Sequence, residues 1–441
     1  MLTGHPGKSG CDFDALAATA LARCDVLAQC TEHEGQINRY FLSPAMEECH
    51  QHIRGWMEAA GMTVRVDRAG NLRGYYAASD KFEIEESTTR LIVGSHLDTV
   101  PNAGRYDGIL GVMLGIALVE ALEGQRLEFG VEVVGFSDEE GVRYGLPFIG
   151  SRALIGKLLP PHLARLDASG VPMFAALDRY ASAHPDVINA GLHAGTYGYL
   201  EFHIEQGPVL EHGGLPLGVV ETIAGQSRAT VTFRGRSGHA GTTPMFLRRD
   251  ALAAAAEWLV AVESAAGAMP DLVATTGRIS CEGGAANVIP GMVCCSLDVR
   301  HASDEMRLRA VQEFLAMARS IAGRRQIKVE HAIEYDQPAV ELDATLIALA
   351  EKAVSDAGVS PRRMTSGAGH DAMIVASQIP AAMLFLRNPG GISHHPDEAV
   401  LVEDVALALR AGSHFLDHFQ IHLQGHLQRL TTESEPDSCT T

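Results

Sequence analysis

A strand, a helix and a second strand follow one another between residues 90 and 137. Residues 90–94 form a short apolar run, residues 108–122 are expected to be a helix, and residues 128–137 have the valine-rich character of a strand. A parallel pair of strands needs such a crossover, so this order indicates a βαβ unit and a mainly parallel sheet. In sheets of this kind ligands bind beyond the carboxyl ends of the strands. We therefore expect chemistry at the residues that follow each strand.

His96-Leu97-Asp98 follows the first of these strands, and Asp107 lies one short loop later. Histidine supplies a neutral nitrogen ligand, a carboxylate such as Asp107 can bridge two cations, and Asp98 is placed to orient His96 or a neighbouring group. The triplet alone is explained equally well by a hydrogen-bonded loop. A metal site therefore needs ligands from elsewhere in the chain.

Three later segments supply the missing types of ligand. The strand at 128–136 is followed by Asp138-Glu139-Glu140, the strand at 199–204 carries His203, and the strand at 381–386 is followed by Ser393-His394-His395. Taken singly, an acidic pair is more often a solvated surface, and a strand histidine is more often a core residue. Together these residues predict two metal ions that share one bridging carboxylate. The predicted ligands are His96, Asp107, Glu140, His203 and His394.

The segment between His203 and His394 has its own pattern and contains none of the other predicted ligands. Its predicted order is that of a ferredoxin-like sandwich, β-α-β-β-α-β. We therefore expect an α/β protein in which a catalytic domain, residues 1–215 and 336–423, is interrupted by an inserted α+β domain, residues 216–335. Residues 424–441 are expected to be a polar tail. The predicted elements of the insertion lie at 228–234, 244–263, 272–281, 291–300, 303–321 and 326–335.

The composition restricts the partners and the location of the protein. The net charge of −19, from 54 acidic and 35 basic residues, argues against nucleic acid because no basic face can dominate the surface. An anionic substrate would then need a local arginine. The 8 cysteines show no C-x-x-C spacing, and no apolar run approaches the ~18 residues of a membrane span. We expect a cytoplasmic protein with reduced thiols and no membrane association.

Six motifs, in the same order, make the chain similar to a known family. Among the most specific is His203-Ile204-Glu205-Gln206-Gly207-Pro208. The chain resembles the dinuclear metallohydrolases of the aminoacylase and carboxypeptidase superfamily, in their amidase, hydantoinase and carbamoylase branch. The resemblance implies a metal-binding catalytic domain, and it implies that the inserted domain is a lid and dimerisation domain of a homodimer. The other motifs lie at 94–100, 104–108, 138–141, 238–245 and 391–394.

The resemblance implies that the five predicted ligands hold two divalent ions, with Asp107 as the bridge. The family pattern places the C-terminal ligand directly after Ser393, which selects His394 rather than His395. Manganese or zinc suits a set of imidazoles and carboxylates, and so do cobalt and nickel.

Three residues are implied to take part in catalysis. Glu139 resembles the general base, which takes a proton from water and delivers it to the departing nitrogen. Asp98 is implied to orient His96. His239 resembles the donor that stabilises the transition state from the lid, often the lid of the partner subunit.

The inserted domain is also implied to bind the substrate. Arg300 can form a bidentate fork on a substrate carboxylate, and Asn287 is expected beside it. This local positive charge would offset the repulsion from an acidic surface. Weaker candidates, for the ureido group, are Gln206, Arg228 and the main chain at Gly369.

Within this branch the expected reaction is hydrolysis of a ureido C–N bond on a small carboxylate. Residues 40–45, 55–62 and 366–373 are most similar to allantoate amidohydrolases, which predicts cleavage of allantoate to ureidoglycine, ammonia and carbon dioxide. Two alternative activities stay open because they would use the same residues. The second candidate is N-carbamoyl-L-amino acid hydrolase, and the third is β-ureidopropionase. A metal-binding protein without activity is disfavoured by Glu139, and a peptidase is disfavoured by the motif around His203.

Overall fold

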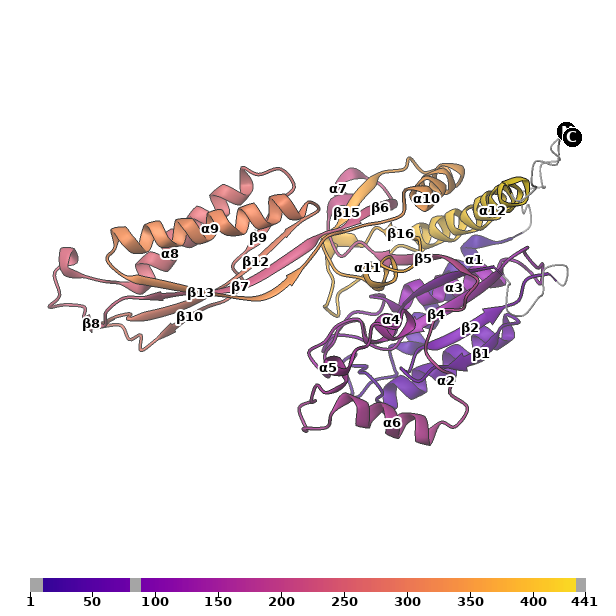
Figure 1. Ribbon diagram of the computed structural model, residues 1–441, viewed down its shortest axis with the longest axis horizontal. Coiled ribbons are helices and arrows are strands. Elements are labelled where there is room, and N and C mark those ends of the chain that lie inside the picture. The colour runs from indigo at the N-terminus through magenta and orange to yellow at the C-terminus, as the bar shows by residue number, and fades with distance from the viewer. Residues whose placement is uncertain (1–10, 80–88, 434–441) are drawn as a thin grey trace, which may run out of the picture. The chain divides into compact units, whose positions relative to one another are not determined.

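The computed structural model describes residues 11–79 and 89–433, which fold into two compact units (Figure 1). Thr222–Glu341 together with Thr365–Gly369 form the inserted unit, and the other described residues form the larger unit. Among the described residues, no helix combines the length and the apolar character that crossing a membrane requires.

The larger unit is built on a nine-stranded sheet. Its four central strands, β4, β3, β5 and β16, are parallel to one another. On either side of them β1, β2, β6 and β14 form antiparallel pairs. The predicted βαβ unit is confirmed, because β3 and β4 pair in parallel and α3 lies between them in sequence. The strand order is β1 (Thr63–Val66), β2 (Leu72–Tyr76), β4 (Gly130–Phe136), β3 (Arg90–His96), β5 (Thr196–Ile204), β16 (Ala381–Leu386), β6 (Leu217–Ile223) and β14 (Val340–Glu341), with β15 (Arg363–Ser366) on β6.

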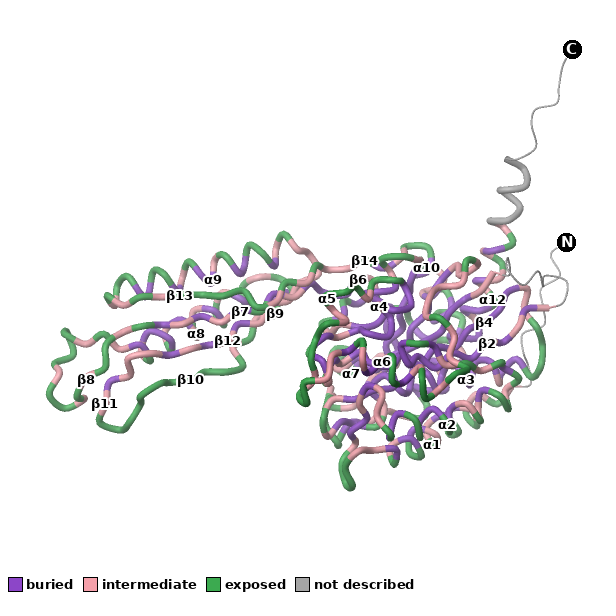
Figure 2. The backbone as a smooth tube through the Cα atoms, turned by 60° about the horizontal axis from the view of Figure 1, so that its bottom comes forward, coloured by how far each residue is buried: buried purple, intermediate pink, exposed green. Residues whose placement is uncertain are grey.

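Helix α3 (Ile109–Glu120) lies at the centre of the larger unit because it is apolar on all sides. It packs on β3, β4 and β5, and α1 (Phe13–Leu27) and α12 (Val402–Glu433) cover it. Helix α10 (Ala344–Asp356) packs on α12. Figure 2 shows the buried residues concentrated in the interior of this unit. The parallel strands thus pack on a buried helix, and their carboxyl ends lie at one edge of the sheet.

The remaining helices of the larger unit are mostly short. The longest of them, α2 (Pro44–Ala59), packs on β1 and β2, and the Ser43 side chain caps it by accepting a hydrogen bond from the Met46 main chain. The others are α4 (Ile149–Leu154), α5 (Pro160–Leu163), α6 (Met173–Ala183), α7 (Val209–Gly213), α11 (Asp371–Val375) and the 3-10 turn η2 (Pro389–Gly391).

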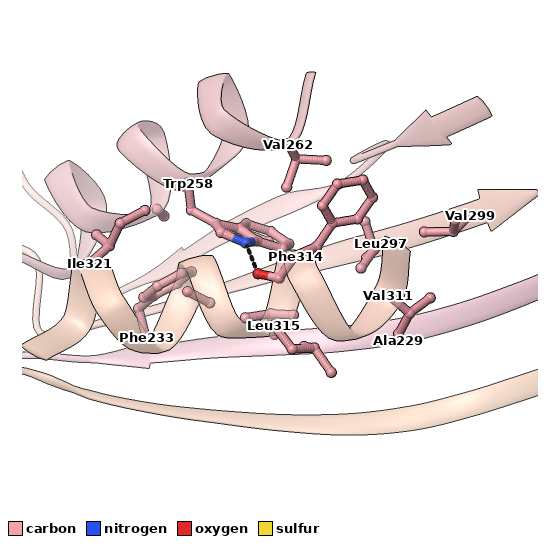
Figure 3. Packing of buried hydrophobic residues seen from close by; sticks show 14 of the residues in the cluster. Ala229, Phe233, Trp258, Val262, Leu297, Val299, Val311, Phe314, Leu315 and Ile321 are labelled. Atoms are coloured by element: carbon pink, nitrogen blue, oxygen red, sulfur yellow. Dashed lines mark hydrogen bonds between the residues drawn. The ribbon is translucent and has the colours of Figure 1, made fainter. Parts of the chain in front are cut away.

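The inserted unit has the predicted β-α-β-β-α-β order around an antiparallel sheet. Helices α8 (Ala251–Gly267) and α9 (Asp304–Arg324) pack against each other and against the sheet. Between them Trp258 is fully buried, and its Nε1 donates to the main-chain oxygen of Phe314 at 2.8 Å (Figure 3). The strand order is β10 (Ile279–Glu282), β12 (Met292–His301), β7 (Gly225–Arg234) and β13 (Lys328–Gln337), with β9 (Val273–Thr275) also on β12.

Two elements of the inserted unit differ from the prediction. The helix expected from residue 244 begins at Ala251, because Pro244 precedes a 3-10 turn, η1 (Met245–Leu247), and the Asp250 side chain caps the new start. The strand expected at 272–281 is split into β9 and β10.

Two boundaries also differ. Residues 217–223, expected in the insertion, form β6 of the large sheet, so the inserted unit begins at Thr222 and extends to Glu341. The expected polar tail begins inside a helix, since α12 continues to Glu433 through residues that are mostly good helix formers. The rest of that tail, 434–441, lies outside the described residues.

Candidate metal centre

The carboxyl ends of β3 and β5 bring two histidines together. His96 is the last residue of β3, and His203 lies one residue before the end of the parallel neighbour β5. Both residues are buried, and their Nε2 atoms lie 3.4 Å apart. The Oδ1 atom of Asp107 lies 3.2 Å from the His203 Nε2 and 3.8 Å from the His96 Nε2. Three ligand-type atoms therefore converge where the prediction placed a metal.

Asp107 reaches this position from the loop before α3. The next residue, Gly108, has a φ of 69°, and a Cβ atom there would lie 2.4 Å from the His96 ring. Only glycine combines this backbone conformation with the close approach. The loop can therefore pass directly against the imidazole and present the Asp107 carboxylate to it.

A second group of ligand-type atoms shares Asp107. The Nε2 atom of His394 lies 3.2 Å from the Asp107 Oδ2 and 3.4 Å from the Glu140 Oε1. The groups His96, Asp107, His203 and Asp107, Glu140, His394 each have ligand atoms within 4.8 Å of one another. The side chain of His395 is 58% exposed, and its Nδ1 accepts from the Asp397 main chain. A mixed set of nitrogen and oxygen donors around one shared carboxylate fits two divalent ions.

The electrostatics of the site also fit bound cations. Burial, and after it the negative charge of Asp107, raises the pKa of Glu140 to about 7. Burial likewise raises the pKa of Glu139 well above its usual range, with the charge of Glu140 as the next cause. Burial lowers the pKa of His203 to about 4, which keeps its ring neutral and able to bind metal. The hydrogen bond to Asp107 raises the pKa of His394 to about 8, and despite burial the hydrogen bonds to Asp107 and Asp98 hold the pKa of His96 well above its usual range. A divalent ion at these groups would replace such protons and offset the charge of the crowded carboxylates.

Asp98 lies beside His96, and its side chain also contacts a neighbouring turn. Its Oδ1 accepts from the Glu139 main chain at 2.9 Å and its Oδ2 accepts from the Glu140 main chain at 3.0 Å. The atom within hydrogen-bond distance of the His96 Nδ1 is the main-chain oxygen of Asp98, at 3.0 Å, whereas the Oδ1 lies at 3.6 Å. The side chain thus holds the Glu139-Glu140 turn, and the main chain of Asp98 orients the imidazole.

Gln206 lies at the metal centre. Its Nε2 donates to both carboxylate oxygens of Asp107, at 3.1 and 3.2 Å, and to the Ser393 Oγ at 3.0 Å. The residue has a φ of 58°, which is uncommon outside glycine. We expected Gln206 to contact the ureido group, and here its amide donates to the Asp107 carboxylate that the two ligand groups share.

Two buried acids next to the ligands were not predicted. Glu201, on β5, accepts from the Ser95 Oγ at 3.1 Å and from the Ala372 main chain at 2.8 Å. Glu398 accepts from the main chain of the loop that carries Asp107. A charged residue inside the apolar strand 199–204 could have drawn attention to Glu201, whereas nothing in the local sequence distinguishes Glu398 from a surface acid.

The inserted unit brings together the segments that carry His239 and Asn287. His239, on β8 (Gly238–His239), pairs with Val288 of β11 (Val288–Ile289). The Ala240 main chain donates to the Asn287 main-chain oxygen at 2.9 Å. His239 therefore lies on β8, and Asn287 lies in the turn that directly precedes the adjoining strand β11.

Arg300 lies in a different part of the inserted unit. Its Nε and Nη2 donate to the two carboxylate oxygens of Asp298, at 2.9 and 3.2 Å, and its Nη1 donates to the Gly367 main-chain oxygen. The Arg228 Nε also donates to Asp298, at 3.0 Å. Both arginines line a cavity of about 580 Å³, together with Glu334 and apolar residues such as Leu297. Gly369 belongs to the same short segment as Gly367.

Within one chain Asn287 does not lie beside Arg300. In the ladder between β12 and β7, Met292 pairs with Arg234 and His301 pairs with Gly225, so β12 runs the length of the sheet. Asn287 precedes β12, and Arg300 is near its other end. An extended strand rises about 3.3 Å per residue, so Met292 and Arg300 are separated by roughly 26 Å.

Comparisons with known proteins place the chain as a whole among its relatives. The sequence matches the peptidase family M20/M25/M40 over residues 92–418. It is 38% identical to an allantoate deiminase of Arabidopsis thaliana, over 90% of this chain and 81% of the relative. It is 35% identical to an N-carbamoyl-L-amino-acid amidohydrolase of Pseudomonas sp. strain NS671, over 84% of this chain and 90% of the relative. The crystal structure of a hydantoinase/carbamoylase family amidase from Burkholderia multivorans has a TM-score of 0.84 at 29% identity, covering 91% of this chain and 97% of that one.

Proposed function

This chain belongs to the peptidase family M20/M25/M40, and we therefore propose that it is a dinuclear metal-dependent hydrolase of a ureido C–N bond. The observation that carries the proposal is the pair of ligand groups that share the Asp107 carboxylate, with Glu139 adjacent to them in sequence. His96 and His203 would hold one ion with Asp107. Glu140 and His394 would hold the other.

Manganese or zinc is the metal that we propose, because the donors are imidazoles and carboxylates without a thiolate. When bound, two such ions polarise a carbonyl group and lower the pKa of water between them.

Glu139 is proposed to move the proton. Its main-chain N–H is fixed by Asp98, and its side chain is buried beside the ligand groups. A carboxylate held in this place can accept a proton from the attacking water and deliver it to the departing nitrogen. Delivery is required because an amide anion does not leave at neutral pH.

Allantoate is the substrate that we propose, with ureidoglycine, ammonia and carbon dioxide as products. The similarity to an allantoate deiminase over 90% of the chain supports it. The cavity around Arg300 supports it as well, because a second ureido group needs polar partners, and Arg228 and Glu334 provide them. Arg300 would anchor the carboxylate. An N-carbamoyl-L-amino acid is the second candidate, given the relative of that name, and β-ureidopropionate is the third.

A homodimer is proposed to complete each centre. The chain enters and leaves the inserted unit at the Arg300 end of β12, whereas His239 and Asn287 lie at the opposite end. Next to them the apolar side chains of η1 are exposed, with Phe246 at 86%. A large apolar surface of this kind marks an interface. We propose that this end of one subunit serves the metal centre of its partner.

The substrate is tested by measuring kcat/KM from ammonia release with allantoate, several N-carbamoyl-L-amino acids and β-ureidopropionate, on protein loaded with Mn²⁺. For N-carbamoyl amino acids and β-ureidopropionate the released ammonia comes from the carbamoyl group, so one assay serves all of them. We expect allantoate to give the highest kcat/KM. Turnover of carbamoyl amino acids without turnover of allantoate would contradict the proposed substrate and leave the reaction class intact.

A further inference from the structure

Two loops nearly 300 residues apart in sequence meet at one buried carboxylate, that of Glu398. Its Oε1 accepts from the Tyr106 main chain at 2.7 Å and from the Asp107 main chain at 3.0 Å. The residue is 2% exposed. Buried carboxylates that accept main-chain hydrogen bonds fix the backbone that donates them. Glu398 therefore holds the loop that presents the shared ligand Asp107.

The same carboxylate also reaches the segment that carries His394. The Ser393 Oγ donates to the Glu398 Oε2 at 3.5 Å, and Ser393 in turn accepts from Gln206. On the other side the fit is close, since a Cβ atom on Gly104 would lie 2.4 Å from Glu398. The carboxylate is thus enclosed between the Asp107 loop and the His394 turn.

The two ligand groups differ in what supports them. His96 and His203 lie on adjacent hydrogen-bonded strands, whose spacing the sheet fixes. His394 lies in a turn with a φ of 56°, and its side chain is 49% exposed. A non-glycine residue in this conformation persists only where its surroundings hold it. The His394 group therefore needs a support that the sheet does not provide.

We propose that Glu398 is a positioning residue that assembles the metal position formed by Asp107, Glu140 and His394. It does so by holding the Asp107 loop against the His394 turn, and it does not bind metal itself. Without it this position loses affinity for metal, while the position formed by His96 and His203 is retained. The inference rests on the proposed two-metal function and goes beyond it by separating the two positions.

The test is a titration of metal-stripped protein with Mn²⁺, with free Mn²⁺ followed by electron paramagnetic resonance. Four proteins are compared: wild type, Glu398→Ala, Glu398→Gln and, as a matched control, Asp397→Ala, whose side chain is 78% exposed. Wild type and Asp397→Ala should bind two equivalents. Glu398→Ala should keep one tight equivalent and bind the second roughly 10- to 100-fold more weakly, since the hydrogen bonds that hold the Asp107 loop are lost.

Glu398→Gln should bind the second equivalent within about threefold of wild type, because an amide oxygen can still accept from Tyr106 and Asp107. If Glu398→Ala does not fold, Gly104→Ala displaces the carboxylate without removing it and should weaken the second equivalent alone.

Three outcomes would overturn the inference. The first is two tight equivalents in Glu398→Ala, or in Gly104→Ala where that variant replaces it. The second is an equal loss of both equivalents. The third is a Gln variant as weak as the Ala variant. If wild-type protein binds no Mn²⁺ at all, the proposed function falls as well, so the two failures are distinguishable.

Discussion

The two carboxylate oxygens of Asp98 accept hydrogen bonds from successive main-chain N–H groups, those of Glu139 and Glu140. One side chain thus fixes the turn that carries both the proposed base and a proposed ligand. The sequence motif indicated that Asp98 belongs to the site. It did not indicate which of its atoms would contact His96, because that depends on a turn 40 residues further along the chain.

Glu139→Gln should retain the fold and the metal but lose turnover. The amide keeps the shape of the side chain and cannot accept the proton, so kcat should fall by roughly 10²- to 10⁴-fold. Metal content and thermal stability serve as the controls. A variant with a near-native rate and two bound metals would place the base elsewhere.

Arg300→Ala should chiefly weaken substrate binding. The guanidinium is held in place by Asp298 and by the Gly367 main chain, so it is oriented before the substrate arrives. Loss of a charge-assisted pair predicts a roughly 10- to 100-fold rise in KM. Arg300→Lys keeps the positive charge but cannot form two parallel hydrogen bonds, so its KM should lie between those of wild type and Arg300→Ala. Saturation curves that do not change on Arg300→Ala would refute the anchoring role.

At the level of elements, the sequence predicted the helices and strands that the spacing of apolar residues determines. The parallel core follows from apolar runs separated by α3, and ligands that directly follow strands, such as His96, could be located for the same reason. The pattern could not locate Glu398, since its position depends on how a C-terminal loop packs on the Asp107 loop. It also joined the 3-10 turn η1 to helix α8, because Pro244 suits the start of a helix and apolar residues lie on both sides of Asp250.

Helix α2 carries a histidine that should make stability depend on pH. Burial lowers the pKa of His50 to about 3, so the folded protein keeps it neutral while the unfolded chain protonates it near 6.5. The unfolded state then binds more protons below pH 6.5, and stability must fall as the pH drops from there toward 3. At pH 5 this residue should account for about 2 kcal/mol of that loss.

Urea unfolding at pH 7 and pH 5, in wild type and in His50→Leu, measures this contribution. The variant cannot titrate at this position, so its free energy of unfolding should decline less between the two pH values. Equal declines in both proteins would show that His50 is not neutral and buried in the folded state.

At the scale of the whole molecule, β12 separates the proposed substrate anchor from the proposed transition-state donor. Arg300 lies at the end where the chain crosses to the larger unit, and His239 lies beyond the opposite end. Sequence order gave no sign of this separation, because Asn287 and Arg300 are close in sequence and only an extended strand places them far apart. The acidic surface, with a net charge of −19, makes the arginines of the inserted unit the local attraction for an anion.

A mixed dimer should therefore recover activity that neither parent has. Glu139→Gln and His239→Ala chains should each be nearly inactive alone. If His239 serves the partner's centre, a dimer with one chain of each kind contains one complete centre. Random assembly makes half of the dimers mixed, so equal co-expression should restore about a quarter of wild-type activity. No recovery in dimers shown to be mixed would mean that His239 acts within its own chain or not at all.

The most direct test of the account is the rate of ammonia release from allantoate as Mn²⁺ or Zn²⁺ is added back to metal-stripped protein. Bound metal is counted in the same samples. We expect negligible release without metal and a rate that rises until two ions are bound per chain. We also expect a chelator to reverse the gain. Undiminished release from protein that holds no metal would contradict the two-metal mechanism, and no release from fully loaded protein would contradict the assignment of allantoate.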